Sequence, residues 1–204
     1  MKIVKINPQK IEDDLIEESI RLMKSGKIIL YPTDTLYGLG ANIFDENALK
    51  ELYSVKKRST TKPISVCVSN IDWIPKVAKI SSKKLVIISK ILPGPFTIIL
   101  KKKDCISELL TGGSETIGIR IPDSEICQKI SQKFPITTTS ANISGQETKK
   151  SVDEILEQLD TDLGLVIDAG PSLADKASTV IDFTLDPPII LRKGSGTFSS
   201  DLFD

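Results

Sequence analysis

The stretch IILYPTDTLYGLGAN, residues 28–42, decides the fold class of this chain. It opens with a run of apolar residues that is typical of a buried strand, and Pro32 ends that run. Before it, residues 11–23 repeat apolar side chains at helical spacing. After it, residues 46–57 predict a second helix, with Asp45 as its N-cap. A buried strand between two amphipathic helices indicates an α/β fold.

The same alternation continues along the chain. Further helices are predicted at 81–92, 123–133 and 151–159. Further strand-like runs lie at 63–68, 96–100, 116–121, 135–140, 165–168, 178–183 and 189–192. The pattern amounts to about seven strands and about five helices. Because no helix separates the last three strands, we expect a mixed sheet and not a purely parallel one.

Length and composition describe an ordinary globular chain. With 204 residues, of which 40% are hydrophobic and 26% charged, we expect one domain over residues 1–204. Lys plus Arg and Asp plus Glu each number 27, and this zero net charge argues against a surface that binds nucleic acid throughout. The N-terminus has no signal-peptide core, and no apolar run approaches about 18 residues. We therefore expect a cytoplasmic protein with no membrane partner.

The absence of histidine excludes several chemistries. A Ser-His-Asp triad, a Cys-His dyad and a histidine-ligated metal are all ruled out. The three cysteines, Cys67, Cys105 and Cys127, form no CxxC pair, so neither a disulfide framework nor a zinc ribbon is expected. No P-loop and no dinucleotide fingerprint is present.

Small, hydroxylic and basic residues cluster where the predicted strands and helices end. In residues 31–42, Thr33 and Thr35 either form part of a plain turn or orient a ligand. Residues 56–63, KKRSTTKP, hold four positive charges and no acid. Such a run is either a solvated helix end, favoured by the helix dipole, or a grip for phosphate.

Three later segments carry similar residues. The hydroxyls of residues 137–145 either satisfy one another in a turn or line a polar pocket. Ser178 opens a predicted strand, and Arg192 ends the last one beside glycines. Arg120, within an apolar strand, lies either on a solvated face or in a polar cleft, paired with a carboxylate.

In their order along the chain, these motifs resemble the YrdC/TsaC family of threonylcarbamoyl-AMP synthases. The resemblance runs from about residue 10 to residue 196 and rests on YPTDTLYGLGAN, KKR followed by KPISV, LPGPFT, TIGIRIP, TTSANISG, ASTVIDF and LRKGSG. It implies a twisted mixed sheet with a concave basic cleft. Longer members add a linker and a second C-terminal domain, which this chain is expected to lack.

The resemblance also implies an activity. Family members convert L-threonine, bicarbonate and ATP, with Mg²⁺ on the nucleotide, into threonylcarbamoyl-adenylate and pyrophosphate. The threonylcarbamoyl group then reaches tRNA, directly or through a transferase complex. A carbamate oxygen is already an anion, so its attack on phosphorus needs no histidine as general base.

Site residues follow from the resemblance position by position. The implied ATP contacts are Lys56, Arg58, Lys62, Thr116, Ser140, Asn142 and Arg192, with Lys56 and Arg58 catalytic. The implied threonine contacts are Thr35, Cys67, Arg120, Thr138 and Ser178. No protein side chain is identified as a metal ligand. Two positions depart from the family: Ser59 stands where proline is usual, and Cys67 where longer members have histidine.

Two other functions stay open. The first is a carbamoyl-adenylate-forming relative of the kind found in hydrogenase-maturation carbamoyltransferases, although those carry further modules. The second is a non-catalytic module that binds double-stranded RNA or tRNA. It would use the basic tracts Lys56–Arg58, Lys101–Lys103 and Lys149–Lys150, but no aromatic stacking platform interleaves with them.

Overall fold

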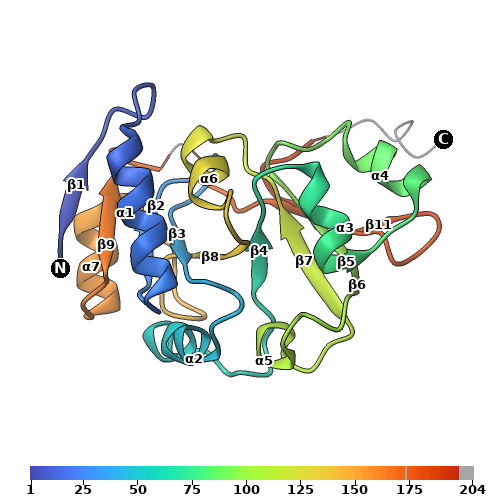
Figure 1. Cartoon of the computed structure of the whole chain (residues 1–204), viewed down its shortest axis with the longest axis horizontal. Coiled ribbons are helices and arrows are strands. Elements are labelled where there is room, and N and C mark those ends of the chain that lie inside the picture. Colours follow the sequence, from blue (N-terminus) through green and yellow to red (C-terminus); the bar gives the residue numbers. More distant parts are fainter. Residues whose placement is uncertain (173, 198–204) are drawn as a thin grey trace.

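The structure, a computed structural model, describes residues 1–172 and 174–197. Within them the chain forms a mixed sheet of eleven strands with helices on both faces (Figure 1). The strands are β1 (Ile3–Lys5), β2 (Ile29–Tyr31), β3 (Gly38–Gly40), β4 (Ser65–Cys67), β5 (Ala78–Lys79), β6 (Phe96–Lys102), β7 (Thr116–Arg120), β8 (Ile136–Ser140), β9 (Leu165–Asp168), β10 (Thr179–Asp182) and β11 (Ile189–Arg192). The helices are α1 (Asp13–Lys24), α2 (Glu46–Val55), the 3₁₀ turn η1 (Ile71–Trp73), α3 (Ile74–Val77), α4 (Ser82–Ile88), α5 (Glu108–Thr111), α6 (Glu125–Ile130) and α7 (Val152–Leu159).

The strands lie in the order β1-β9-β2-β3-β8-β4-β7-β6-β10-β11, and β5 pairs with β6 beside this path. Four pairs are parallel: β1 with β9, β9 with β2, β4 with β7, and β6 with β10. The other pairs are antiparallel. The predicted α/β class and mixed sheet are confirmed.

Three strands lie outside the predicted runs: β1, β3 and β5. Strand β3 has the sequence Gly-Leu-Gly, and glycine is depleted in strands. Here the glycines leave room for the ring of Tyr31 on the paired strand. A Cβ at Gly40 would lie 2.9 Å from Tyr31 Cε1, and one at Gly38 3.1 Å from its Cζ. The segment after β2 is therefore a hairpin and not a strand-to-helix turn.

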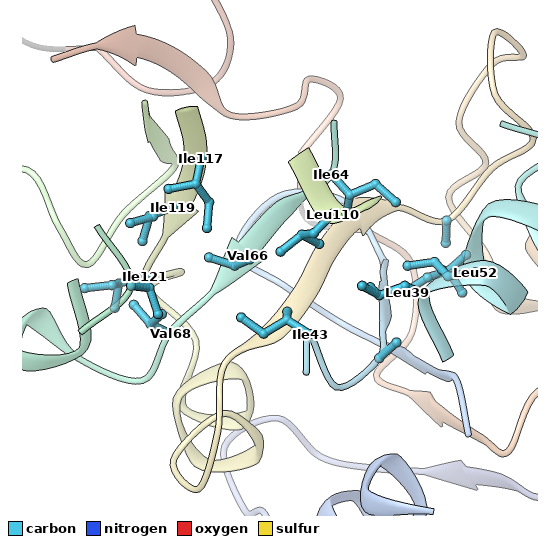
Figure 2. Packing of buried hydrophobic residues seen from close by; sticks show 14 of the residues in the cluster. Leu39, Ile43, Leu52, Ile64, Val66, Val68, Leu110, Ile117, Ile119 and Ile121 are labelled. Carbon is cyan, nitrogen blue, oxygen red and sulfur yellow. The ribbon is translucent and has the colours of Figure 1, made fainter. Parts of the chain in front are cut away.

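Two clusters of buried apolar side chains pack on the two faces of the sheet. On β2, Leu30 belongs to one cluster, and its neighbours Ile29 and Tyr31 belong to the other. This alternation is the period-two pattern of a strand that is buried on both faces. Figure 2 shows the first cluster, in which Val66 of β4 and Ile119 of β7 gather with side chains from other elements.

The second cluster joins the sheet to α1 and α6. The two helices pack against each other, with α1 over the β9 and β2 side of the sheet and α6 nearer to β8 and β4 (Figure 1). The same face continues across β8, β4, β7, β6 and β10, where its side chains are mostly polar and line a cavity. Among residues 1–172 and 174–197, no helix is both long enough and apolar enough to span a bilayer.

Candidate anion-binding site

The cavity has a volume of about 250 Å³ and lies over six strands, from β3 to β10 in the sheet order. The loop between β2 and β3 and the end of β11 form its rim. Hydroxyl groups line it, among them Thr33, Thr35, Thr97, Thr138, Ser140 and Ser178. Three arginines, Arg58, Arg120 and Arg192, also line it, whereas no aspartate or glutamate is among its described lining residues. This charge pattern favours an anionic ligand.

Strand β7 places Arg120 in the cavity. Ile117 and Ile119 point into the apolar cluster of Figure 2, so the residues that alternate with them face the other way. Arg120 is 8% exposed. Its Nη2 donates to Asp34 Oδ1 at 2.7 Å and to Thr35 Oγ1 at 3.2 Å. Arg120 lies in the polar cleft, paired with a carboxylate, and not on a solvated face.

The Nε atom of Arg120 has no hydrogen-bond partner. Among the described residues it is the one buried side-chain nitrogen or oxygen in this condition. A buried donor without an acceptor costs about 1–3 kcal/mol, more when it is charged. Arg120 lines the cavity, and a ligand oxygen that accepted from its Nε would remove that cost.

Arg58 follows α2 and is half-buried at the cavity wall. Its Nε donates to Lys62 O at 3.2 Å, and its Nη2 donates to Pro63 O at 2.9 Å. Burial lowers the pKa of this guanidinium. The two backbone carbonyls fix the direction of the side chain, so its charge is presented to the cavity in one orientation.

Arg192, at the end of β11, is fixed in a similar way. Its Nε and Nη2 donate to Ser178 O at 3.2 and 2.8 Å. Burial, and then the charge of Arg120, lower the pKa of Arg192. Arg120 and Arg192 both line the cavity, and a bound anion would offset the repulsion between their like charges.

Lys56 lies behind the cavity wall and does not line it. It is 1% exposed, and its Nζ donates to Ser140 O, to Asn142 O at 2.8 Å and to Asn142 Oδ1 at 3.4 Å. Burial, and then Arg58, lower the pKa of Lys56 to about 7. Asn142 Oδ1 also accepts from Ser140 Oγ at 2.6 Å. Lys56 and Asn142 therefore support the strand end that presents Ser140.

Three other predicted residues lie outside the cavity lining. Lys62 is exposed, and Thr116 lies at the opposite end of β7 from Arg120. Cys67 Sγ points beneath α6, 3.8 Å from Ser131 Oγ and 4.0 Å from Cys127 O. The structure thus brings together seven of the predicted residues, and the ligand roles of all the predicted residues stay predictions. The seven are Thr35, Arg58, Thr138, Ser140, Ser178, Arg120 and Arg192.

Sequence reasoning missed several polar residues at the site, among them Asp34, Tyr37 and Thr97. Asp34 pairs with Arg120 across 86 residues of sequence. Tyr37 donates to Gly170 O at 2.6 Å, and Thr97 Oγ1 lies 2.7 Å from Ser178 Oγ. The one available signal was that Asp34 is the only acid in residues 31–42.

The described residues contain no group of three or more histidine, cysteine, aspartate or glutamate side chains that could hold a metal ion.

Fold and site together define an α/β protein with a cavity lined by arginines and hydroxyl groups. A family model named Sua5/YciO/YrdC and described as "Telomere recombination" matches residues 21–194. The match spans most of the chain, so the chain belongs to the Sua5/YciO/YrdC family. The resemblance drawn from the motifs is confirmed.

Several relatives are similar over nearly the whole chain. A Methanocaldococcus jannaschii protein, provisionally named threonylcarbamoyl-AMP synthase, is 42% identical over 95% of this chain and 93% of its own length. A threonylcarbamoyl-AMP synthase of Pyrococcus abyssi is 34% identical over 91% of this chain, but this chain covers only 56% of that protein.

Two solved structures also match. The crystal structure of P. abyssi Sua5 complexed with L-threonine has a TM-score of 0.89 and 33% identity, over 95% of this chain and 58% of that one. Escherichia coli YciO has a TM-score of 0.87 and 28% identity, over 97% and 98%. This chain spans little more than half of the P. abyssi proteins and nearly all of YciO.

Proposed function

We propose that this chain is a threonylcarbamoyl-AMP synthase, which makes threonylcarbamoyl-adenylate and pyrophosphate from L-threonine, bicarbonate and ATP. The observation that carries the proposal is one hydroxyl-lined cavity with three arginines and no acid in its described lining. Such a cavity suits two anions at once, a carboxylate and a polyphosphate. Relatives named for this activity, and one bound to L-threonine, support the choice of substrates.

Arg120 and Thr35 form the amino-acid end of the cavity. The guanidinium of Arg120, which lines the cavity, would donate to a carboxylate oxygen of threonine. Thr35 Oγ1 lies beside this guanidinium and would read the substrate hydroxyl. A site that hydrogen-bonds a substrate hydroxyl strongly rejects an analogue without it.

Arg58, Arg192 and Ser140 form the nucleotide end. The two guanidiniums would hold the phosphates and neutralise the charge that develops on the leaving pyrophosphate. Mg²⁺ bound with ATP would add to that neutralisation. Lys56 holds the end of β8 through its hydrogen bond to Ser140 O. Its predicted role in ATP binding would therefore be indirect, by fixing the position of Ser140.

The proposed reaction depends more on the positioning of the carbamate and ATP than on proton transfer. The threonine amine and bicarbonate give a carbamate and water. One carbamate oxygen then attacks the α-phosphorus while the bond to pyrophosphate breaks. The attacking oxygen is already anionic, so a chain without histidine can carry out the step. In reaction class the chain would be a nucleotidyltransferase. Its product would supply a transferase that modifies tRNA in the cytoplasm.

Pyrophosphate release by the purified chain tests this proposal. Reactions would contain ATP, Mg²⁺ and bicarbonate with L-threonine, with L-serine or with neither. We expect release that requires threonine and bicarbonate together, and slower release with serine, because a missing methyl group is worth about 1–3 kcal/mol. No threonine-dependent release from folded protein would contradict the proposal. Binding of tRNA without turnover would favour the RNA-binding module instead.

A further inference from the structure

We infer that Asp34 is a positioning residue that divides the cavity into a carboxylate end and a polyphosphate end, by holding and neutralising Arg120. The role assigned to Asp34 rests on the proposed function. This role goes beyond the proposed function, because it explains how three arginines of like charge in one cavity can prefer different anions.

The contacts of Asp34 fix Arg120 from behind. Its Oδ1 accepts from Arg120 Nη2 at 2.7 Å, and its Oδ2 accepts from the backbone N–H of Asp123 at 3.1 Å. The two side chains are only 9% and 10% exposed. Both oxygens of the carboxylate are thus engaged, one by the guanidinium and one by the segment that follows β7. With Nη2 held in this way, the guanidinium keeps one position at the cavity wall, and its Nε has no partner.

Asp34 itself does not line the cavity that holds the three arginines. It lines a second cavity of about 210 Å³, which shares the loop between β2 and β3 with the first. Its effect on a ligand must therefore pass through Arg120, either as geometry or as charge.

The charge effect separates the three arginines. Arg120 has a carboxylate 2.7 Å away, whereas the contacts given for Arg58 and Arg192 are to backbone carbonyls and a hydroxyl. A polyphosphate gains most from unneutralised cations, so it favours the Arg58 and Arg192 end. The paired Arg120 attracts a polyanion less strongly but can still donate one directed hydrogen bond to a monoanionic carboxylate. Pyrophosphate is thereby kept away from the threonine end.

Calorimetric titrations of L-threonine and of inorganic pyrophosphate test this role in Asp34→Asn. The variant keeps the side-chain shape and removes the charge. We expect threonine to bind about tenfold more weakly, because Arg120 loses its anchor. We expect pyrophosphate to bind at least about threefold more tightly at low salt, because a third cation becomes available. Asp162→Asn, a matched change at an exposed aspartate between α7 and β9, should leave both affinities as in the wild type.

Asp34→Glu separates geometry from charge and also serves if Asp34→Asn fails to fold. It should weaken threonine binding but leave pyrophosphate binding unchanged. Parallel loss of both ligands in Asp34→Asn, or wild-type affinities for both, would overturn the role of Asp34. If the wild-type chain binds no threonine, the proposed function fails, and the pyrophosphate comparison still decides whether Asp34 masks a cation.

Discussion

At the scale of single residues, removal of the Arg58 side chain should reduce activity without unfolding the protein. Arg58→Ala should cost about 2–4 kcal/mol of transition-state stabilisation, or about 30- to 1000-fold in pyrophosphate release. The reason is that a guanidinium aimed by two carbonyls at the cavity would no longer meet the phosphates. Stability should change little because the side chain is half-buried and its contacts are with one local loop.

Arg21→Ala is the matched control for that change. Arg21 lies exposed in the last turn of α1, away from the cavity lining. The control should release pyrophosphate at the wild-type rate. Near-native turnover by Arg58→Ala would remove its phosphate role.

Lys56 makes stability depend on pH in a predictable direction. Burial lowers its pKa in the folded chain to about 7, while the unfolded value stays near the usual 10.4. Between these values the unfolded chain binds the extra proton, so the free energy of unfolding rises with pH, by up to about 1.4 kcal/mol per pH unit. Relative to Lys56→Met, wild-type stability should therefore increase from pH 7 to pH 9, measured by urea denaturation. A difference that stays constant across this range would show that Lys56 titrates at its ordinary pKa.

Local sequence could suggest chemistry at single positions but not partners. Arg120 could be recognised as an arginine in an apolar strand, and the alternation with Ile117 and Ile119 explains why it faces away from the core. The carboxylate partner of Arg120 could not be recognised from local sequence. Asp34 is 86 residues away and contacts Arg120 only when the sheet has formed. For Cys67 the resemblance indicated a threonine contact, but its thiol lies under α6.

At the scale of elements, β3 is a strand that the residue preferences of its own sequence do not predict. Each predicted strand run overlaps an observed strand, because those runs hold apolar residues buried on at least one face or paired at the sheet edge. A Gly-Leu-Gly strand gives no such signal. Its glycines are there because they leave room for the ring of Tyr31 on the neighbouring strand. Strand β5 has two residues and is too short to show a period.

Gly40→Ala should therefore destabilise the fold through Tyr31. The added Cβ would lie 2.9 Å from Tyr31 Cε1, and overpacking of this kind costs about 1–3 kcal/mol. Thermal unfolding of the variant should show that loss. In a Tyr31→Leu background the loss should shrink, because the ring is gone. The same loss in both backgrounds would mean that the glycine is needed for its backbone alone.

At the scale of the whole molecule, the order of the strands in the sheet brings the residues of the site together. Loop residue Thr35, helix-end residue Arg58 and strand-end residue Arg192 come from distant parts of the chain. They meet because β3, β8, β4, β7, β6 and β10 lie side by side. No local pattern encodes this order, which depends on how the two apolar clusters close on the two faces. The ordered motif set anticipated it only through resemblance to a family.

The most direct test of the central claim follows the carbon of bicarbonate. The chain would be incubated with ATP, Mg²⁺, L-threonine and ¹³C-bicarbonate, and the nucleotide products identified by mass spectrometry. We expect threonylcarbamoyl-adenylate that carries the label, formed together with pyrophosphate and greatly reduced in Arg58→Ala. An adenylate without the label, or no adenylate from protein that binds both ATP and threonine, would contradict it.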